Sequence, residues 1–115
     1  MISDVFCKIL NKELPADVVA EDKDWIAIND IHPQAPVHVL IISRKHFADL
    51  IEAKESDAEL LGKMILAANE MAAKLKLEKG FRLIINRGED GGQLVPHFHI
   101  HLLGGKRLGA KIVND

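Results

Sequence analysis

The spacing of apolar residues predicts two helices of very different length. Residues 5–10 place Val5, Phe6, Ile9 and Leu10 at helical intervals, and Pro15 ends this segment, which indicates a short helix. The second helix is expected to start at Ser56 and Glu59, which form a Ser-x-x-Glu capping box, and to stop at Gly80. Its apolar stripe is typical of a helix packed on a core. The stripe consists of Leu60, Leu61, Met64, Ile65, Ala68, Met71, Ala72 and Leu75.

Short apolar or alternating runs bounded by turn residues predict five strands. The expected strands are residues 18–20, 25–28, 37–43, 81–86 and 97–103. Residues 37–43 are apolar on nearly both faces, which indicates a central strand, and the two prolines of residues 29–36 indicate a loop. The predicted fold class is α+β, with an antiparallel sheet of about five strands, one long helix and one short helix.

Composition and charge narrow the class of protein without naming a chemistry. The 115 residues suit a single domain spanning 1–115, with 48% hydrophobic and 28% charged residues. The net charge of −2 gives no general attraction to nucleic acid or to an anionic membrane, so we expect neither as a partner. Cys7 is the only cysteine, and residues 1–4 do not resemble a signal peptide. We therefore expect a soluble, cytoplasmic protein.

Three histidines at alternate positions form the strongest chemical signal. In an extended strand, His97, His99 and His101 would point to one face, while the residues between them would point to the core. They are half of the six histidines in the chain, and unpaired buried imidazoles are costly, so ordinary core packing explains them poorly. Two functional interpretations remain open at this point: a pair of zinc ligands, or a nucleophilic imidazole assisted by its neighbours. About three quarters of a histidine with an ordinary pKa is neutral at pH 7 and able to attack.

The connection before this strand favours the second interpretation. Residues 87–96 are ten residues long, although a hairpin needs only about two to five, which indicates a functional loop. Within it, residues 90–93 (Asp-Gly-Gly-Gln) can turn tightly and aim backbone N–H groups at an anion. A phosphate cradle beside a nucleophile suits phosphoryl or nucleotidyl transfer, whereas a closed zinc site has no need of one.

These residues resemble the signature of the histidine triad (HIT) family. The resemblance is carried by residues 91–105, which read Gly-Gly-Gln-Leu-Val-Pro-His-Phe-His-Ile-His-Leu-Leu-Gly-Gly. Residues 5–9, 29–36 and 79–82 are also similar to the Hint branch of that family, the nucleoside phosphoramidases. The resemblance covers nearly the whole chain and implies a HIT-like fold.

The resemblance implies a role for four histidines. His99 would attack the α-phosphorus and form a nucleotidyl-histidine intermediate, which water then hydrolyses. His101 would contact the phosphate and assist the leaving group. His97 would orient the nucleophile, with His38 behind it in the same polar network.

The resemblance also implies binding residues for the rest of a nucleotide. The expected phosphate-binding groups are Asn86 and the backbone at Gly92, Leu94 and Val95. Asp30 would accept hydrogen bonds from the ribose. The purine would pack against Phe6, Ile9, Ile31 and Leu40. From the residues alone, Asn86 as a strand-ending cap and Asp30 as a turn former remain alternatives.

The chain departs from the family pattern at three places. Leu94 stands where many relatives carry Ser, Thr or Glu, and the tail, residues 106–115, lacks the Trp-Pro-Pro ending of some animal relatives. Some relatives bind structural zinc through Cys-x-x-Cys and two histidines. The corresponding residues here are Asp4, Cys7, His46 and His97, so one cysteine is missing. We therefore expect no metal and no cofactor, with a residual zinc site as the alternative.

The sequence predicts a homodimeric purine nucleoside phosphoramidase that hydrolyses AMP- or GMP-linked amines, with the sheet extended across the dimer. One alternative is a dinucleoside polyphosphate hydrolase of the Fhit kind, although that branch typically has Gln in place of His101. Another is a nucleotide-binding or scaffold protein with vestigial activity, which Leu94 favours and the complete histidine set disfavours. A metal-binding module is the third alternative.

Overall fold

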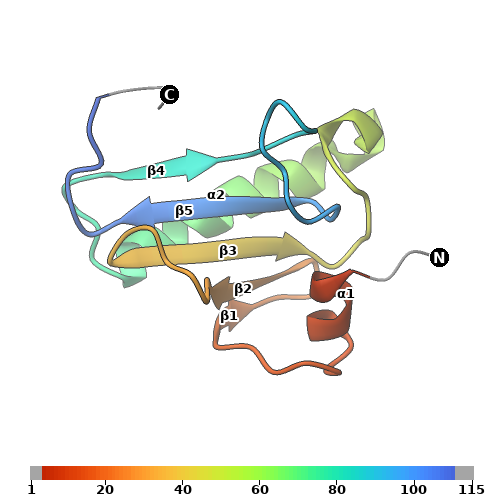
Figure 1. The fold of residues 1–115 in the computed structure, drawn as a ribbon, viewed down its shortest axis with the longest axis horizontal. Helices are drawn as coiled ribbons and strands as arrows, with labels where there is room; N and C mark the ends of the chain where they lie inside the picture. The colour runs from red at the N-terminus through yellow and green to blue at the C-terminus, as the bar shows by residue number, and fades with distance from the viewer. Residues whose placement is uncertain (1–3, 111–115) are drawn as a thin grey trace.

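A five-stranded antiparallel sheet forms the centre of the computed structural model, which describes residues 4–110. The strands are β1 (Val18–Glu21), β2 (Trp25–Asn29), β3 (Val37–Ser43), β4 (Phe81–Ile84) and β5 (His99–Gly104), in the order β1-β2-β3-β5-β4. The helices are α1 (Val5–Leu10), η1 (Leu50–Glu52), η2 (Glu55–Asp57) and α2 (Ala58–Lys74). Figure 1 shows α2 crossing one face of the sheet and α1 lying near β1 and β2. The predicted α+β class is confirmed. Residues 111–115 of the tail lie outside the described residues.

The two faces of the sheet carry different residues because side chains alternate along each strand. On one face, Ile41 and Ile100 pack with Met64 of α2, and Phe98 stacks on Phe47 with ring centroids 4.9 Å apart. On the opposite face, a second apolar cluster lies beneath α1. It consists of Phe6, Ile26, Ile28, Leu40 and Ile42. The histidines of β3 and β5 alternate with the first core and therefore lie on the α1 side.

The predicted helix cap is wrong. Ser56 lies inside the 3₁₀ turn η2, and α2 begins two residues later, at Ala58. The turn is held instead by Asp57, whose carboxylate accepts the Lys54 N–H at 3.0 Å and pairs with Lys45. The ion pair between Lys45 and Asp57 therefore holds this turn, and the predicted cap at Ser56 does not form.

Two predicted strands are longer than the observed ones. β4 ends at Ile84, opposite His101, instead of at residue 86, and β5 begins at His99 instead of His97. The backbone before His99 turns away because the His97 N–H donates to Val95 and the Phe98 N–H donates to Phe47.

Among residues 4–110, no helix combines the length and the apolar character needed to cross a membrane.

The packing predicts that Phe98 contributes strongly to the stability of the fold. Replacing Phe98, 2% exposed, with Ala should lower the free energy of unfolding by about 3–5 kcal/mol, because it leaves a cavity beneath β5. Replacing Ile51, 72% exposed on η1, with Ala should change it by less than about 0.5 kcal/mol. Urea denaturation of both variants measures the difference, and equal losses would contradict this assignment of the core.

Candidate active site

Two histidines of β5 form the centre of the candidate active site. His99 and His101 point to the same face, with ring centroids 5.0 Å apart. The Nδ1 of His99 lies 2.7 Å from the backbone carbonyl oxygen of His97. A carbonyl only accepts, so Nδ1 carries the hydrogen and Nε2 keeps its lone pair. Phe6 packs edge-on against this ring at 5.0 Å. His99 therefore presents a fixed tautomer with a nucleophilic nitrogen.

His101 has the complementary tautomer because of a hydrogen-bond chain from the 29–36 loop. The Gln34 N–H donates to Nδ1 of His38 at 3.1 Å, so the hydrogen of the neutral His38 ring is on Nε2. That nitrogen lies 2.9 Å from Nδ1 of His101 and 3.4 Å from Oδ2 of Asp30. Since Nδ1 of His101 accepts, its Nε2 carries a hydrogen. The site thus places an imidazole acceptor beside an imidazole donor.

Burial keeps both rings neutral. Burial lowers the pKa of His99 below its usual 6.5; the bond to the His97 carbonyl opposes this, and the nearby charge of His97 adds to it. Burial, together with repulsion from His99 and His38, lowers the pKa of His101 to about 4. At neutral pH neither ring carries a positive charge, so His99 is available as a nucleophile.

The third histidine lies apart from this pair. His97 precedes β5 and is fully buried, so the expectation of three histidines on one strand is wrong in this respect. Its Nδ1 lies 3.2 Å from Oδ2 of Asp4, and its Nε2 lies 2.6 Å from the Ser43 carbonyl oxygen. Nδ1 also lies 3.6 Å from Sγ of Cys7, so both nitrogens of the ring have polar partners that hold it in place. His97 contributes to the site through its backbone carbonyl.

The glycine-rich loop is held in place by the side chain of Gln93. Its Nε2 donates to the carbonyls of Ala48 at 2.6 Å and Val95 at 3.0 Å, and its Oε1 accepts the Gly88 N–H at 3.2 Å. Gly91 allows the loop to close, because a Cβ there would lie 2.3 Å from the Arg87 carbonyl oxygen. The sequence placed Gln93 in the motif but did not predict this organising role, which depends on a loop 45 residues away.

The predicted phosphate-binding residues have different surroundings. The N–H of Gly92 donates to the Glu89 carbonyl at 3.0 Å, so it is engaged within the loop. The N–H groups of Leu94 and Val95 make no hydrogen bond among residues 4–110, and the Leu94 side chain is 93% exposed. Asn86 is half-buried just after β4, and its amide makes no side-chain hydrogen bond within the described chain. Leu94, Val95 and Asn86 are therefore available to an anion.

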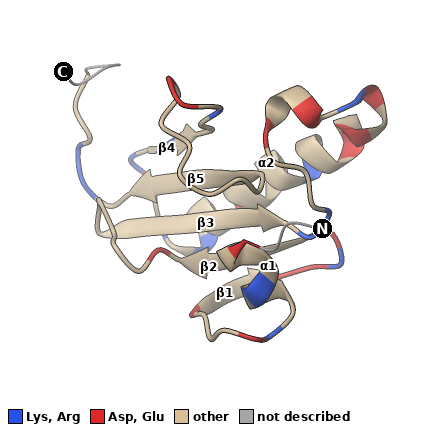
Figure 2. Cartoon of the chain, turned by 45° about the vertical axis from the view of Figure 1, so that its right-hand side comes forward, with Lys and Arg blue, Asp and Glu red and all other residues tan. Residues whose placement is uncertain are grey.

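Charged side chains are absent from the two strands that carry the site. Figure 2 shows β3 and β5 without Lys, Arg, Asp or Glu, which occur in the loops and helices. A bound phosphate would depend on imidazoles, backbone N–H groups and amides.

The predicted nucleoside-binding residues are only partly brought together. Phe6, Ile9 and Leu40 share the apolar cluster beneath α1, whereas Ile31 is 86% exposed and lies outside it. Asp30 is also a turn former, since its Oδ1 accepts the His32 N–H at 2.7 Å while Oδ2 faces His38. The role of Asp30 as a turn former is therefore compatible with its expected role as an acceptor for the ribose.

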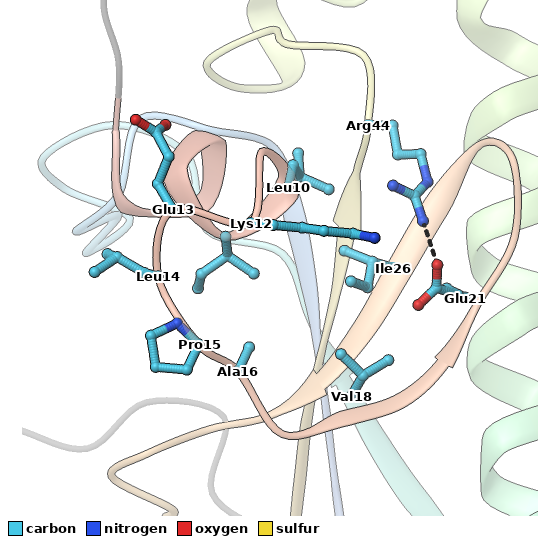
Figure 3. A pocket seen from close by; sticks show the side chains of 11 residues that line it. Leu10, Lys12, Glu13, Leu14, Pro15, Ala16, Val18, Glu21, Ile26 and Arg44 are labelled. Carbon is cyan, nitrogen blue, oxygen red and sulfur yellow. Dashed lines mark hydrogen bonds and ion pairs between the residues drawn. The ribbon is translucent and has the colours of Figure 1, made fainter.

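Ile9 also lines a hollow of about 430 Å³ between α1, the following loop and β1. Figure 3 shows Leu10, Ile26 and Val18 around it, with Lys12 extended toward Ile26 and Arg44 paired with Glu21. No histidine lines this hollow, so it is separate from the pair His99 and His101.

The residues of the degraded zinc motif do lie together. The ligand atoms of Asp4, Cys7, His46 and His97 all lie within 4.8 Å of one another. One carboxylate, one thiol and two imidazoles form a donor set that fits a zinc ion.

The lowered pKa values predict a loss of stability in mild acid. An unfolded histidine takes up a proton near pH 6.5, whereas folded His101 does so only near pH 4. Between these two values the unfolded state binds the proton and the folded state does not. The contribution of His101 to the free energy of unfolding is therefore complete above pH 6.5 and is lost as the pH falls from 6.5 to 4. Replacing His101 with Gln should make the free energy of unfolding, measured in urea at several pH values, decline less steeply between pH 6.5 and 4. Equal slopes would contradict the assignment.

Comparisons with known proteins identify the family of the chain. A family profile described as the HIT domain matches residues 11–108. The chain is 47% identical over 104 residues to an uncharacterized HIT-like protein of Synechococcus elongatus, covering 90% of this chain and 91% of that protein. A HIT family hydrolase from Clostridium thermocellum is 50% identical, with a TM-score of 0.94 over 98% of this chain and 99% of that one. A histidine triad protein from Clostridium difficile is 38% identical, with a TM-score of 0.92, and the match covers 96% of this chain and 97% of that one. The chain therefore belongs to the HIT family.

Proposed function

We propose that the protein hydrolyses purine nucleoside phosphoramidates, releasing AMP or GMP and a free amine. The observation that carries the proposal is the pair of fixed tautomers: His99 presents a bare Nε2, and His101 beside it presents an Nε2–H. A nucleophile and a proton donor 5.0 Å apart between ring centroids can act on one phosphorus centre.

The reaction proceeds in two steps. The lone pair on Nε2 of His99 attacks the α-phosphorus, a new P–N bond forms, and the bond to the leaving amine breaks. The amine nitrogen leaves with the hydrogen from Nε2 of His101 as that ring takes up a proton from solution, so the ring remains neutral. Water then attacks the nucleotidyl-histidine, the P–N bond to His99 breaks, and one proton of the water is released to solution. The net reaction consumes one water molecule.

The remaining groups bind the nucleotide. The N–H groups of Leu94 and Val95 and the Asn86 amide would hold the phosphate oxygens, because they have no partner among residues 4–110. Asp30 would accept the ribose hydroxyls. Phe6, Ile9 and Leu40 would support the purine, with Ile31 covering it from its exposed position.

Family membership supports hydrolysis, since the Clostridium thermocellum relative is described as a HIT family hydrolase. The choice of a phosphoramidate depends on His101, because a leaving amine needs a proton and the Fhit branch typically carries Gln there. A dinucleoside polyphosphate would be the substrate if phosphoanhydrides are cleaved faster, and a binding or scaffold role would follow from tight AMP binding without turnover.

A homodimer is part of the proposal. β4 is an edge strand of the sheet; Phe81 at its start is 39% exposed, and Ile85, directly after its end, is 38% exposed. Pairing of β4 with its copy would cover these side chains and extend the sheet. We also expect the protein to act in the cytoplasm, where a lone cysteine such as Cys7 remains reduced.

Removal of the nucleophile provides the direct test. With an adenosine phosphoramidate as substrate, replacing His99 with Ala should lower kcat by at least about 1,000-fold, because no other group is placed to form the intermediate. His32, exposed in the 29–36 loop, is the matched control, and H32A should keep the wild-type rate. Unchanged AMP release by H99A would refute the proposed role of His99.

The exposed position of Leu94 predicts that a polar side chain there increases activity. Replacing Leu94 with Ser should raise kcat/KM about tenfold, because a hydroxyl adds one hydrogen bond to a charged phosphate at an exposed position. Replacing Leu94 with Ala removes the same side chain without adding a donor and should leave kcat/KM near the wild-type value. Equal rates for both variants would show that the side chain at this position does not contact the substrate.

A further inference from the structure

The N-terminus of α1 is connected to the candidate active site through one carboxylate. Oδ1 of Asp4 accepts the Cys7 N–H at 2.8 Å and so caps α1. Oδ2 lies 3.1 Å from Nε2 of His46 and 3.2 Å from Nδ1 of His97. Asp4 is buried, at 9% exposure, and a buried carboxylate is stable only when such partners are present.

The carboxylate of Asp4 thus lies between two imidazoles, at the start of a helix.

The same contacts fix the position of residue 97. Its ring is held at Nδ1 by Asp4 and at Nε2 by the Ser43 carbonyl at the end of β3, and it is fully buried. The backbone carbonyl of this residue is the acceptor that sets the tautomer of His99, at 2.7 Å. A ring released from Asp4 would allow residue 97 to shift, and the acceptor for His99 would move with it.

A zinc ion would occupy the same place if one were bound. Asp4, Cys7, His46 and His97 would hold it, and it would supply a structural cross-link between α1 and the residues before β5. A carboxylate differs from a thiolate because it bridges two imidazole N–H groups without an ion.

We propose that Asp4 is a positioning residue for His99: its carboxylate joins His46 and His97, and so fixes the His97 carbonyl without requiring a metal ion. The part concerning His99 as a nucleophile rests on the proposed function; the carboxylate bridge itself does not.

The test compares two substitutions of Asp4. Asn caps helices as well as Asp, so D4N keeps the bond from the Cys7 N–H but loses the charge and the second acceptor. D4N should lower kcat for an adenosine phosphoramidate about 10- to 100-fold while KM changes less than about threefold, because the purine contacts are unaffected. D17N is the matched control and should keep the wild-type kcat, since among residues 4–110 the exposed Asp17 side chain bonds only to Asn29.

D4C reconstructs a Cys-x-x-Cys pair and should convert the bridge into a metal site. Wild-type protein should contain less than about 0.1 zinc per chain, and its Tm should not change with EDTA. D4C should bind about one zinc per chain, and its Tm should fall when EDTA is added. Wild-type protein with one zinc per chain and an EDTA-sensitive Tm would overturn the proposal.

A readout independent of activity separates this proposal from the proposed function. Long-range proton–nitrogen NMR of the imidazoles should show the Nδ1–H tautomer of His99 in the wild type and a mixture of tautomers in D4N. If the wild type cleaves no phosphoramidate, this spectrum still tests the bridge. A D4N protein with lowered Tm but an unchanged His99 tautomer and kcat would show that Asp4 is only structural, and would overturn the positioning role.

Discussion

The antiparallel pairing of β3 with β5 is the constraint on which the rest of the molecule depends. Its register places Leu40 opposite His101 and Ile42 opposite His99. Because side chains alternate, the same register sends Ile41 and Ile100 into the core beneath α2. A slip by one residue would bury the imidazoles under the helix and expose the core, so packing and chemistry are fixed by one set of backbone hydrogen bonds.

Burial in this region serves stability and reactivity together. Buried imidazoles are costly unless their nitrogens have partners, and no buried side-chain nitrogen or oxygen among residues 4–110 lacks one. The partners that satisfy His99 and His101 also assign their hydrogens, one ring as acceptor and one as donor. The same desolvation lowers both pKa values, so the structure that accommodates the rings also keeps them neutral.

The elements differ in how far the sequence predicted them. The five strands and the long helix were predicted near their observed positions because alternate or helical spacing of apolar residues reflects a local requirement for burial. Within the predicted stripe, Met64, Ala68, Met71 and Ala72 are buried, whereas Ile65 is 47% exposed. The helix ends at Lys74, before Leu75 and the predicted stop at Gly80. The cap at Ser56 was wrong because Lys45, a distant residue, pairs with Asp57. The start of β5 was placed too early because the backbone of residues 97 and 98 bonds to Val95 and Phe47, which no local pattern reveals.

By itself, the sequence determined the fold class, the family resemblance and the residues expected to meet the phosphate, because these are written in residue types and in their spacing. Only the tertiary structure decided what each histidine does. His97 contributes a carbonyl because Asp4 and Ser43 hold its ring, and His101 keeps its Nε2 hydrogen because His38 donates to the other nitrogen. These partners lie 54 to 93 residues away in the chain, and a tautomer depends on which group lies beside each nitrogen in space.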